Sequence, residues 1–499
     1  MKKTLLPNIL CLLWLAAGAL RAQVPQPPEL PGQAAPAADL PAPGFPARAD
    51  TILSTAALAG AQVAVLFASA EDGAVQYARN PDLPLLPAST AKLASSAAAL
   101  ERLTPDFSFS TAFLLNKKEQ GGRKLSVLVW RGTGDPSISG RGRASLDEIF
   151  EVWAGSLAAM GVKKIDRLVI DARYLEGPAV HPSWPADQLT YWYEAETSAV
   201  SFNDNCVDLE FIPAAKAGRR PKIKLNPDSD YLTVKNEAVT GQPDSTFTLD
   251  YSREPGTNTV TFFGSIPAGA SRKDYVAVHD PARFAAEALK RVWKKKGVKV
   301  SRITTWQEAG LKEEDLVPAF IWTSEPLAAL IKVVNKNSQN LYAEQILKTL
   351  GKETGGRGGF AEGIAAVVNF LDRAGLDVGQ FYLVDGSGLS PENRFTAAGL
   401  VRLLSYMSGT PLFPAYFESL AVPGVDRSAR DRMKGDPLAA GMRLKRGTVA
   451  NARNLAGYLH SASGKLYAFA ILVNGAGLNL GAVDEAADQL CLGAANLLP

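Results

Sequence analysis

The sequence predicts an α/β fold of the α+β kind, in which one α/β domain is interrupted by a strand-rich inserted region. An apolar run with a hairpin turn lies near the start, and a second hairpin followed by a helix lies at the end. We therefore expect the two ends of the chain to share one sheet. Between them, residues 104–280 hold short β runs separated by turns, and long amphipathic helices follow. With 499 residues, of which 46% are hydrophobic, the chain can bury more than one core.

The first 22 residues have the pattern of a secretory signal peptide. Lys2 and Lys3 precede an apolar run that reaches Leu20, and Ala22 stands before Gln23. The run is too short for a stable membrane span, although an uncleaved anchor is the alternative. The pattern predicts export, most simply to a bacterial periplasm, with no stable membrane span after cleavage. Residues 23–47 are rich in Pro and Ala, which predicts a disordered linker.

The charge balance gives no reason to expect a nucleic-acid partner. The chain has 53 Lys and Arg residues against 50 Asp and Glu residues, and three of the basic ones lie in the predicted signal peptide. The remaining Cys206 and Cys491 are too few for a disulfide scaffold or a cysteine metal site. We interpret both as small core residues, with one disulfide as the alternative. Three scattered histidines make a zinc site improbable, so we expect neither a metal nor a cofactor.

The predicted elements follow from apolar periodicity and turn residues. In the first part, residues 48–103, two strands are joined at Asp72-Gly73 and a helix follows Ser89. The insertion, residues 104–280, holds a helix that ends near residue 160 and strands at 124–131, 164–171, 231–234, 247–251 and 259–263. The second part, residues 281–499, starts with a helix after Pro281 and continues with helices at 325–334, 340–350 and 359–374, strands at 454–460 and 465–474, and a helix at 483–497.

One pair of residues has the spacing of an amine-activated nucleophile. Ser89 and Lys92 are three residues apart at the start of the first helix, so their side chains fall on one face of that helix. No other serine in the chain is followed by a lysine at this spacing. A lysine can act as the base for a serine if burial or a neighbouring cation keeps its amine neutral.

Two further segments offer the groups that such a site needs. Ser338 and Asn340 lie two residues apart just before a predicted helix, and Lys445 is followed by Arg446-Gly447-Thr448 ahead of an apolar hairpin. Gly447 would allow close approach of two backbones. A rival copy of the S-x-N pattern, Ser201-Phe202-Asn203, lies in the insertion, and a strict K-[ST]-G sequence occurs nowhere.

Taken together, these motifs resemble those of the D-alanyl-D-alanine carboxypeptidase/endopeptidase family, the class C low-molecular-mass penicillin-binding proteins. The resemblance runs from about residue 50 to the end. It includes residues 87–93 (PASTAKL), 131–136 (RGTGDP), 201–205 (SFNDN), 337–341 (NSQNL), 385–390 (DGSGLS) and 425–432 (VDRSARDR). It implies a penicillin-binding-protein/β-lactamase-like transpeptidase domain, interrupted by the insertion, and it assigns the catalytic S-x-N copy to Ser338.

The resemblance also implies the chemistry. A serine D,D-peptidase would cleave the terminal D-Ala-D-Ala bond or D-Ala cross-links of peptidoglycan stem peptides through an acyl-enzyme on Ser89, and β-lactams would inhibit it. The family pattern maps catalytic roles onto Ser89, Lys92, Ser338, Asn340 and Lys445, and substrate binding onto Arg446, Gly447 and Thr448. Two alternatives stay open: a serine β-lactamase, and a non-catalytic peptidoglycan-binding scaffold that kept the fold.

Arg446 departs from the family pattern, which has Thr or Ser between the lysine and the glycine. Three hypotheses follow. The Arg446 guanidinium could bind the terminal carboxylate of the substrate through bidentate hydrogen bonds. Alternatively, Arg446 could point away and leave Thr448 alone to bind, or it could fill the cleft and cripple the site.

Overall fold

The computed structural model describes residues 44–119 and 122–499. The predicted signal peptide and most of the predicted linker lie outside the described residues. The first described helix, α1 (Phe45–Leu53), begins three residues before the start expected at Arg48. Pro46 fits there because the first helical turn needs no N–H from that residue. Phe45 is 1% exposed and its ring packs edge-on against Phe67, with centroids 5.0 Å apart.

The two ends of the chain meet in one antiparallel sheet, as the sequence predicts. The strand order is β18-β19-β20-β1-β2, and β1 pairs with β20 along its full length, from Gln62 opposite Asn474 to Ser69 opposite Tyr467. The bounds are β1 (Gln62–Ser69), β2 (Val75–Arg79), β18 (Arg443–Val449), β19 (Ala452–His460) and β20 (Leu466–Asn474).

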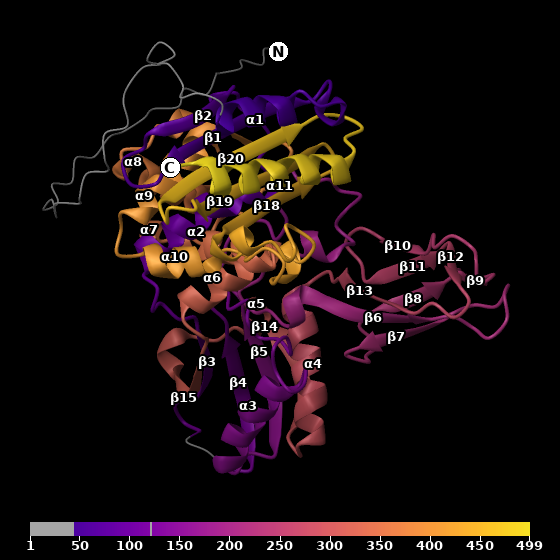
Figure 1. The fold of residues 1–499 in the computed structure, drawn as a ribbon. Coiled ribbons are helices and arrows are strands. Elements are labelled where there is room, and N and C mark those ends of the chain that lie inside the picture. The colour runs from indigo at the N-terminus through magenta and orange to yellow at the C-terminus, as the bar shows by residue number, and fades with distance from the viewer. Residues whose placement is uncertain (1–43, 120–121) are drawn as a thin grey trace, which may run out of the picture.

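Both faces of this sheet are buried, and alternate residues of β1 show it. Val63, Val65 and Phe67 pack in the core beneath α1 and α11 (Leu480–Leu497), whereas Ala64 and Leu66 face a second core of helices. That second layer consists of α2 (Lys92–Leu103), α6 (Leu327–Lys336), α7 (Asn340–Gly355), α8 (Phe360–Arg373), α9 (Ala397–Ser408) and α10 (Phe413–Ser419) (Figure 1). α2 therefore lies inside the molecule with a helix or sheet on most of its sides, which explains its small side chains.

The inserted region contains a second five-stranded sheet, in the order β14-β5-β4-β3-β15. Its strands are β3 (Ser110–Asn116), β4 (Lys124–Arg131), β5 (Lys164–Asp171), β14 (Lys299–Thr305) and β15 (Leu316–Thr323). Helices α3 (Glu148–Ala159) and α4 (Pro281–Lys295) share its core, and the short α5 (Trp306–Ala309) follows β14. The structure thus differs from the boundary expected at residue 280, because β14 and β15 pair with strands of the insertion. We propose that the insertion ends near residue 324.

A group of short strands projects from the molecule beside this second sheet (Figure 1). We call residues 206–277 the arm. It holds three small sheets, in the orders β13-β6-β7, β10-β11-β8 and β12-β9. Their bounds are β6 (Cys206–Ile212), β7 (Lys222–Asn226), β8 (Thr233–Asn236), β9 (Val239–Gly241), β10 (Asp250–Arg253), β11 (Thr259–Phe263), β12 (Ser265–Pro267) and β13 (Arg272–Ala277).

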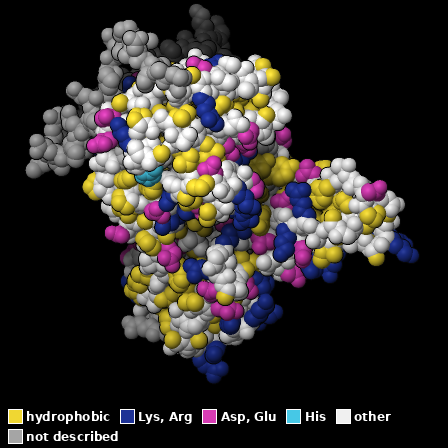
Figure 2. All heavy atoms as spheres, viewed as in Figure 1, with side chains coloured by type: hydrophobic (Ala, Val, Ile, Leu, Met, Phe, Trp, Pro, Cys, Tyr) yellow, Lys and Arg dark blue, Asp and Glu magenta, His cyan; other side chains and the backbone are white. Residues whose placement is uncertain are grey.

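Surface and core features agree with the composition. Basic and acidic side chains intermingle on the face shown in Figure 2. Cys206 and Cys491 are both buried and unpaired, as small core residues. Within residues 44–119 and 122–499, the helices are all too short or too polar to cross a bilayer.

Candidate active site

The structure brings Ser89 and Lys92 together as their spacing predicts. Ser89 lies in a 3₁₀ turn (Ala88–Ala91) that runs directly into α2, and Lys92 is the first residue of that helix. The Lys92 side chain is fully buried, and its Nζ lies 2.9 Å from the Ser89 Oγ. The same amine donates to the Asn340 Oδ1 and to the Ser387 carbonyl, each at 2.6 Å. Lys92 is therefore held in one orientation by acceptors from three segments.

The S-x-N segment that precedes α7 completes the centre. Ser338 adopts a left-handed backbone, with φ of 56°, and its Oγ accepts a 2.9 Å hydrogen bond from the Lys445 Nζ. Lys445 is 1% exposed and also donates to its neighbour's carbonyl, the Arg446 O, at 2.9 Å. Asn340 contacts Lys92 through its oxygen, and its Nδ2 donates to the Tyr193 carbonyl at 2.8 Å. The inserted region thus contributes directly to the position of Asn340.

The rival S-x-N copy has a different place. Ser201 donates to the Gln345 Oε1 at 2.8 Å, and Asn203 donates to the Cys206 carbonyl at 2.9 Å. The next residue, Asp204, accepts a 2.9 Å bond from Gln339, which stands between Ser338 and Asn340. This rival copy is therefore a buried turn that supports the S-x-N segment beside Lys92 and does not compete with it.

A cavity of about 590 Å³ opens over the two serines. Ser89, Ser338, Asn340 and Thr448 line it from the catalytic side. The turn at residues 192–194 and Pro185 line it from the inserted region. Segments far apart in the sequence therefore form one cleft.

Gly447 and Gly388 allow two backbones to approach the nucleophile turn. A Cβ added to Gly447 would lie 2.6 Å from the Pro87 carbonyl oxygen, and one added to Gly388 would lie 1.9 Å from the Ala88 carbonyl oxygen. Gly388 also has a φ of 82°, which other residues rarely adopt. The prediction of close backbone approach at Gly447 is confirmed.

Arg446 does not line the cavity, and its guanidinium is bound by other segments of the chain. Its Nη1 donates to the Ser428 carbonyl at 2.5 Å, and its Nη2 lies 3.5 Å from the Asp484 carboxylate on α11. Thr448 does line the cavity, and its Oγ1 accepts a 2.7 Å hydrogen bond from Arg453. The placement of Arg446 fits the hypothesis in which it points away, and binding of substrate by Thr448 alone stays a prediction.

Burial shapes the protonation of both lysines. Loss of solvent lowers the pKa of Lys92 to about 7, although the nearby Glu344 and Asp385 act to raise it. Burial also lowers the pKa of Lys445 well below its ordinary value, and the positive charges of Lys92 and Arg446 lower it further. A neutral amine beside Ser89 is therefore accessible near neutral pH.

Sequence reasoning missed two carboxylates that organise this centre. Glu344 is fully buried and accepts from the Gly386 and Ser387 N–H groups at 3.0 and 2.7 Å, which places the Ser387 carbonyl on Lys92. Asp385 accepts from the Gly388 and Ser390 N–H groups, each at 2.7 Å. Glu344 stands four residues after Asn340 on α7, so the helical period was a signal that could have found it.

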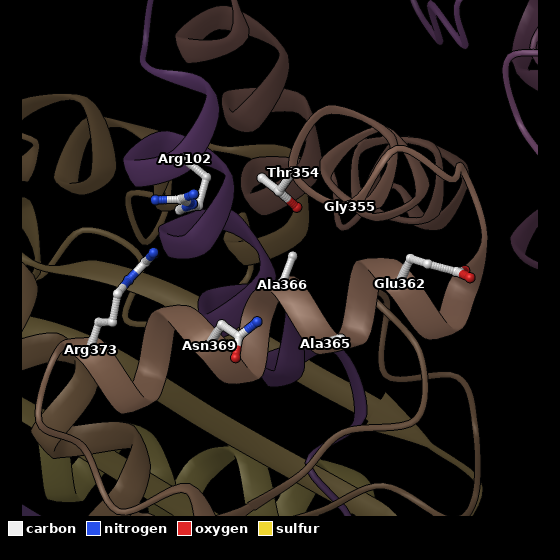
Figure 3. A pocket seen from close by; sticks show the side chains of 8 residues that line it. All are labelled: Arg102, Thr354, Gly355, Glu362, Ala365, Ala366, Asn369 and Arg373. Atoms are coloured by element: carbon white, nitrogen blue, oxygen red, sulfur yellow. The ribbon is translucent and has the colours of Figure 1, made fainter. Parts of the chain in front are cut away.

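Another cavity, away from these residues, lies between the C-terminal ends of α2 and α7 and the length of α8 (Figure 3). Arg102 and Arg373 project toward it from α2 and α8, and Thr354 and Asn369 lie around it. Both arginines lie close to the Glu101 carboxylate, at 3.8 and 3.3 Å. This cavity has none of the buried lysine or serine chemistry of the first one.

Comparison with known proteins agrees with the motifs. The model of the D-Ala-D-Ala carboxypeptidase 3 (S13) family matches residues 46–497. The chain belongs to this family. A D-alanyl-D-alanine carboxypeptidase of Actinomadura sp. (strain R39) is 31% identical over 447 residues, covering 85% of this chain and 80% of that protein. The D-alanyl-D-alanine carboxypeptidase DacB of Haemophilus influenzae is 27% identical over 402 residues, covering 78% of this chain and 81% of that protein.

Solved structures confirm the fold. Penicillin binding protein 4 (dacB) from Haemophilus influenzae superposes with a TM-score of 0.78 at 23% identity, covering 90% of this chain and 99% of that one. The same protein complexed with a β-lactam gives a TM-score of 0.72 at 22% identity. The family resemblance and the α+β fold predicted from the sequence are confirmed, and the chain is a serine-type carboxypeptidase of the S13 family.

Proposed function

We propose that the enzyme cleaves the terminal D-Ala-D-Ala bond of peptidoglycan stem peptides through an acyl-enzyme on Ser89. The observation that carries this proposal is the 2.9 Å contact between the Ser89 Oγ and a fully buried Lys92 whose pKa is lowered to about 7. A neutral amine at that distance can take the hydroxyl proton as the serine attacks.

The remaining residues suit the later steps. The oxyanion that forms on the attacked carbonyl would accept from the backbone N–H groups of Ser89 and Thr448, both of which line the cavity. The departing D-alanine amine would receive its proton through Ser338 and Lys445, whose Oγ and Nζ atoms are 2.9 Å apart. Water then hydrolyses the ester on Ser89, and the serine recovers its proton.

Substrate binding follows from the same placement. The Thr448 hydroxyl, supported by Arg453, would hold the terminal carboxylate of the stem peptide, because the Arg446 guanidinium contacts Ser428 and Asp484. Gly447 keeps the strand close to the nucleophile turn. Cleavage of D-Ala cross-links needs the same acyl chemistry at the same serine, so we include endopeptidase action in the proposal.

The predicted signal peptide indicates that the enzyme acts in the periplasm. Stem peptides lie outside the cytoplasmic membrane, and export to the periplasm would bring the enzyme to them. β-Lactams, as acylating inhibitors, should occupy Ser89 in the same cavity.

Labelling with a fluorescent penicillin tests the assignment, together with D-alanine release from a model pentapeptide. Ser89→Ala should abolish both, because it removes the hydroxyl beside Lys92 that is proposed to form the acyl ester. Ser54→Ala is the matched control, since that hydroxyl is exposed at the end of α1 and should leave both signals intact. Labelling of the Ser89→Ala protein would refute the assignment, and binding of stem peptide without labelling of the native enzyme would favour a scaffold.

A further inference from the structure

A further cavity adjoins the catalytic cavity. It has a volume of about 500 Å³ and lies between the turn at Tyr191–Tyr193 and the arm strands β10 and β13. We call it the arm groove. Trp192 and Tyr193 line both cavities, so the two cavities adjoin at these side chains.

The arm groove combines aromatic faces with a few charged groups. The Tyr191 and Tyr193 rings are stacked, with centroids 5.4 Å apart and planes 13° from parallel. Arg272 and Phe247 also line the groove, and the Arg272 guanidinium lies over the Phe247 ring, 4.5 Å from its centroid. All these side chains are partly or well exposed. Asp250 accepts from the Tyr191 hydroxyl at 3.1 Å, so a carboxylate and a guanidinium border the rings.

The strand edges beside the groove do not suit an added peptide strand. On β10, the Tyr251 N–H donates to Asp250 and the Arg253 N–H donates to Thr190. On β13, the Tyr275 and Ala277 N–H groups are likewise used, by the Asp274 carboxylate and the Thr190 carbonyl. A peptide that binds by strand addition needs such N–H groups as donors. Recognition in the arm groove must therefore come from side chains.

Side chains of this kind fit sugars. The C–H face of a pyranose ring packs on an aromatic face, and its hydroxyl and acetamido groups hydrogen-bond with carboxylates and guanidinium groups. We propose that the arm groove binds the N-acetylated amino-sugar units of the glycan strand to which the stem peptide is attached. This proposal rests on the proposed function for its substrate, because a stem peptide in the catalytic cavity carries its glycan at its far end.

Binding to peptide-free glycan strands tests the groove apart from catalysis. The full chain and its Ser89→Ala variant should both co-sediment with glycan strands from which stem peptides have been removed. Phe247→Ala and Arg272→Ala should each weaken this binding by about tenfold, as expected for a lost aromatic or arginine contact. Phe263→Ala and Lys273→Ala are matched controls, because both side chains are exposed on the arm but do not line the groove.

Kinetics then show whether the groove serves the substrate. The native enzyme should have a higher kcat/KM for a disaccharide-linked pentapeptide than for the free pentapeptide, and Phe247→Ala should remove this advantage while turnover of the free pentapeptide stays unchanged. Absence of glycan binding by the native chain, or equal binding by the groove variants and the controls, would overturn the proposal. Failure of the proposed function would instead appear as glycan binding without D-alanine release or penicillin labelling.

Discussion

The active site contains two buried lysines, Lys92 and Lys445, and the charges around them have opposite signs. Lys92, at the start of a helix, donates to three acceptors and has Glu344 and Asp385 near enough to raise its pKa. Lys445, on a strand, has a hydroxyl and a carbonyl as partners, and the charges that act on it are positive. Burial lowers the pKa of both amines, but the carboxylates near Lys92 partly offset this effect, whereas the positive charges near Lys445 add to it.

The largest expected effect comes from the lysine next to the nucleophile. Lys92→Ala should slow acylation by a fluorescent penicillin by about 10³-fold, because it removes the general base. Lys332→Ala, on the exposed side of α6, is the control and should acylate at the native rate. Near-native acylation of the Lys92→Ala protein would break the comparison, since another group would then have to take the Ser89 proton.

The second lysine should matter less. Lys445→Ala should slow D-alanine release by about 10²-fold, because Ser338 loses the amine 2.9 Å away but Lys92 remains beside Ser89. Rapid-quench measurement of D-alanine release checks this value. A loss equal to that of Lys92→Ala would show that the two amines act as one unit.

The pH profile sharpens the comparison further. Lys92 must be unprotonated to accept a proton, so acylation should rise with pH through about 7 and then level off. Glu344→Gln should move this rise slightly to lower pH, because only ionised Glu344 raises the pKa of Lys92, and burial raises the pKa of Glu344 itself to about 8. The acylation rate between pH 5 and pH 9 measures the shift, and a move to higher pH would contradict the assigned role of Glu344.

The smallest effect is expected at the departure from the family pattern. Arg446→Thr should change kcat/KM for the pentapeptide by no more than about twofold, because the guanidinium contacts Ser428 and Asp484 outside the cavity. Thr448→Val is the contrasting variant, and it should raise KM. A tenfold loss in the Arg446→Thr protein would support direct contact of Arg446 with the substrate carboxylate.

Local patterns predicted individual elements better than the partners those elements choose. β4 and β5 have the predicted bounds, residues 124–131 and 164–171, because alternation and turn residues lie within or beside the strand itself. The end of the insertion was expected at residue 280, where a helix begins. However, β14 and β15 pair with β5 and β3, which lie more than a hundred residues earlier. No local pattern within residues 299–323 indicates these pairing partners.

The site divides in the same way. The i, i+3 spacing of Ser89 and Lys92 is a property of one helix turn, so the sequence could predict it. The contact of Lys445 with Ser338 joins segments 107 residues apart, so residue types alone made both residues candidates and the family resemblance was needed to assign them to one site. Arg446 shows the limit most clearly, since its neighbour Asp484 becomes a partner only when α11 packs beside β18 and β19.

The hydrogen bond from the Asn340 amide to the Tyr193 carbonyl limits how the inserted region can be removed or exchanged. It ties the orientation of Asn340, and hence one of the three acceptors that hold Lys92, to a turn of the inserted region. Removing the inserted region to obtain a minimal hydrolase would leave the Asn340 amide without the Tyr193 carbonyl as acceptor. Lys92 would then be held less firmly, because Asn340 is one of its three partners. Exchanging the inserted region between distant relatives should succeed only when the turn at Tyr193 is exchanged together with α7, whose first residue is Asn340.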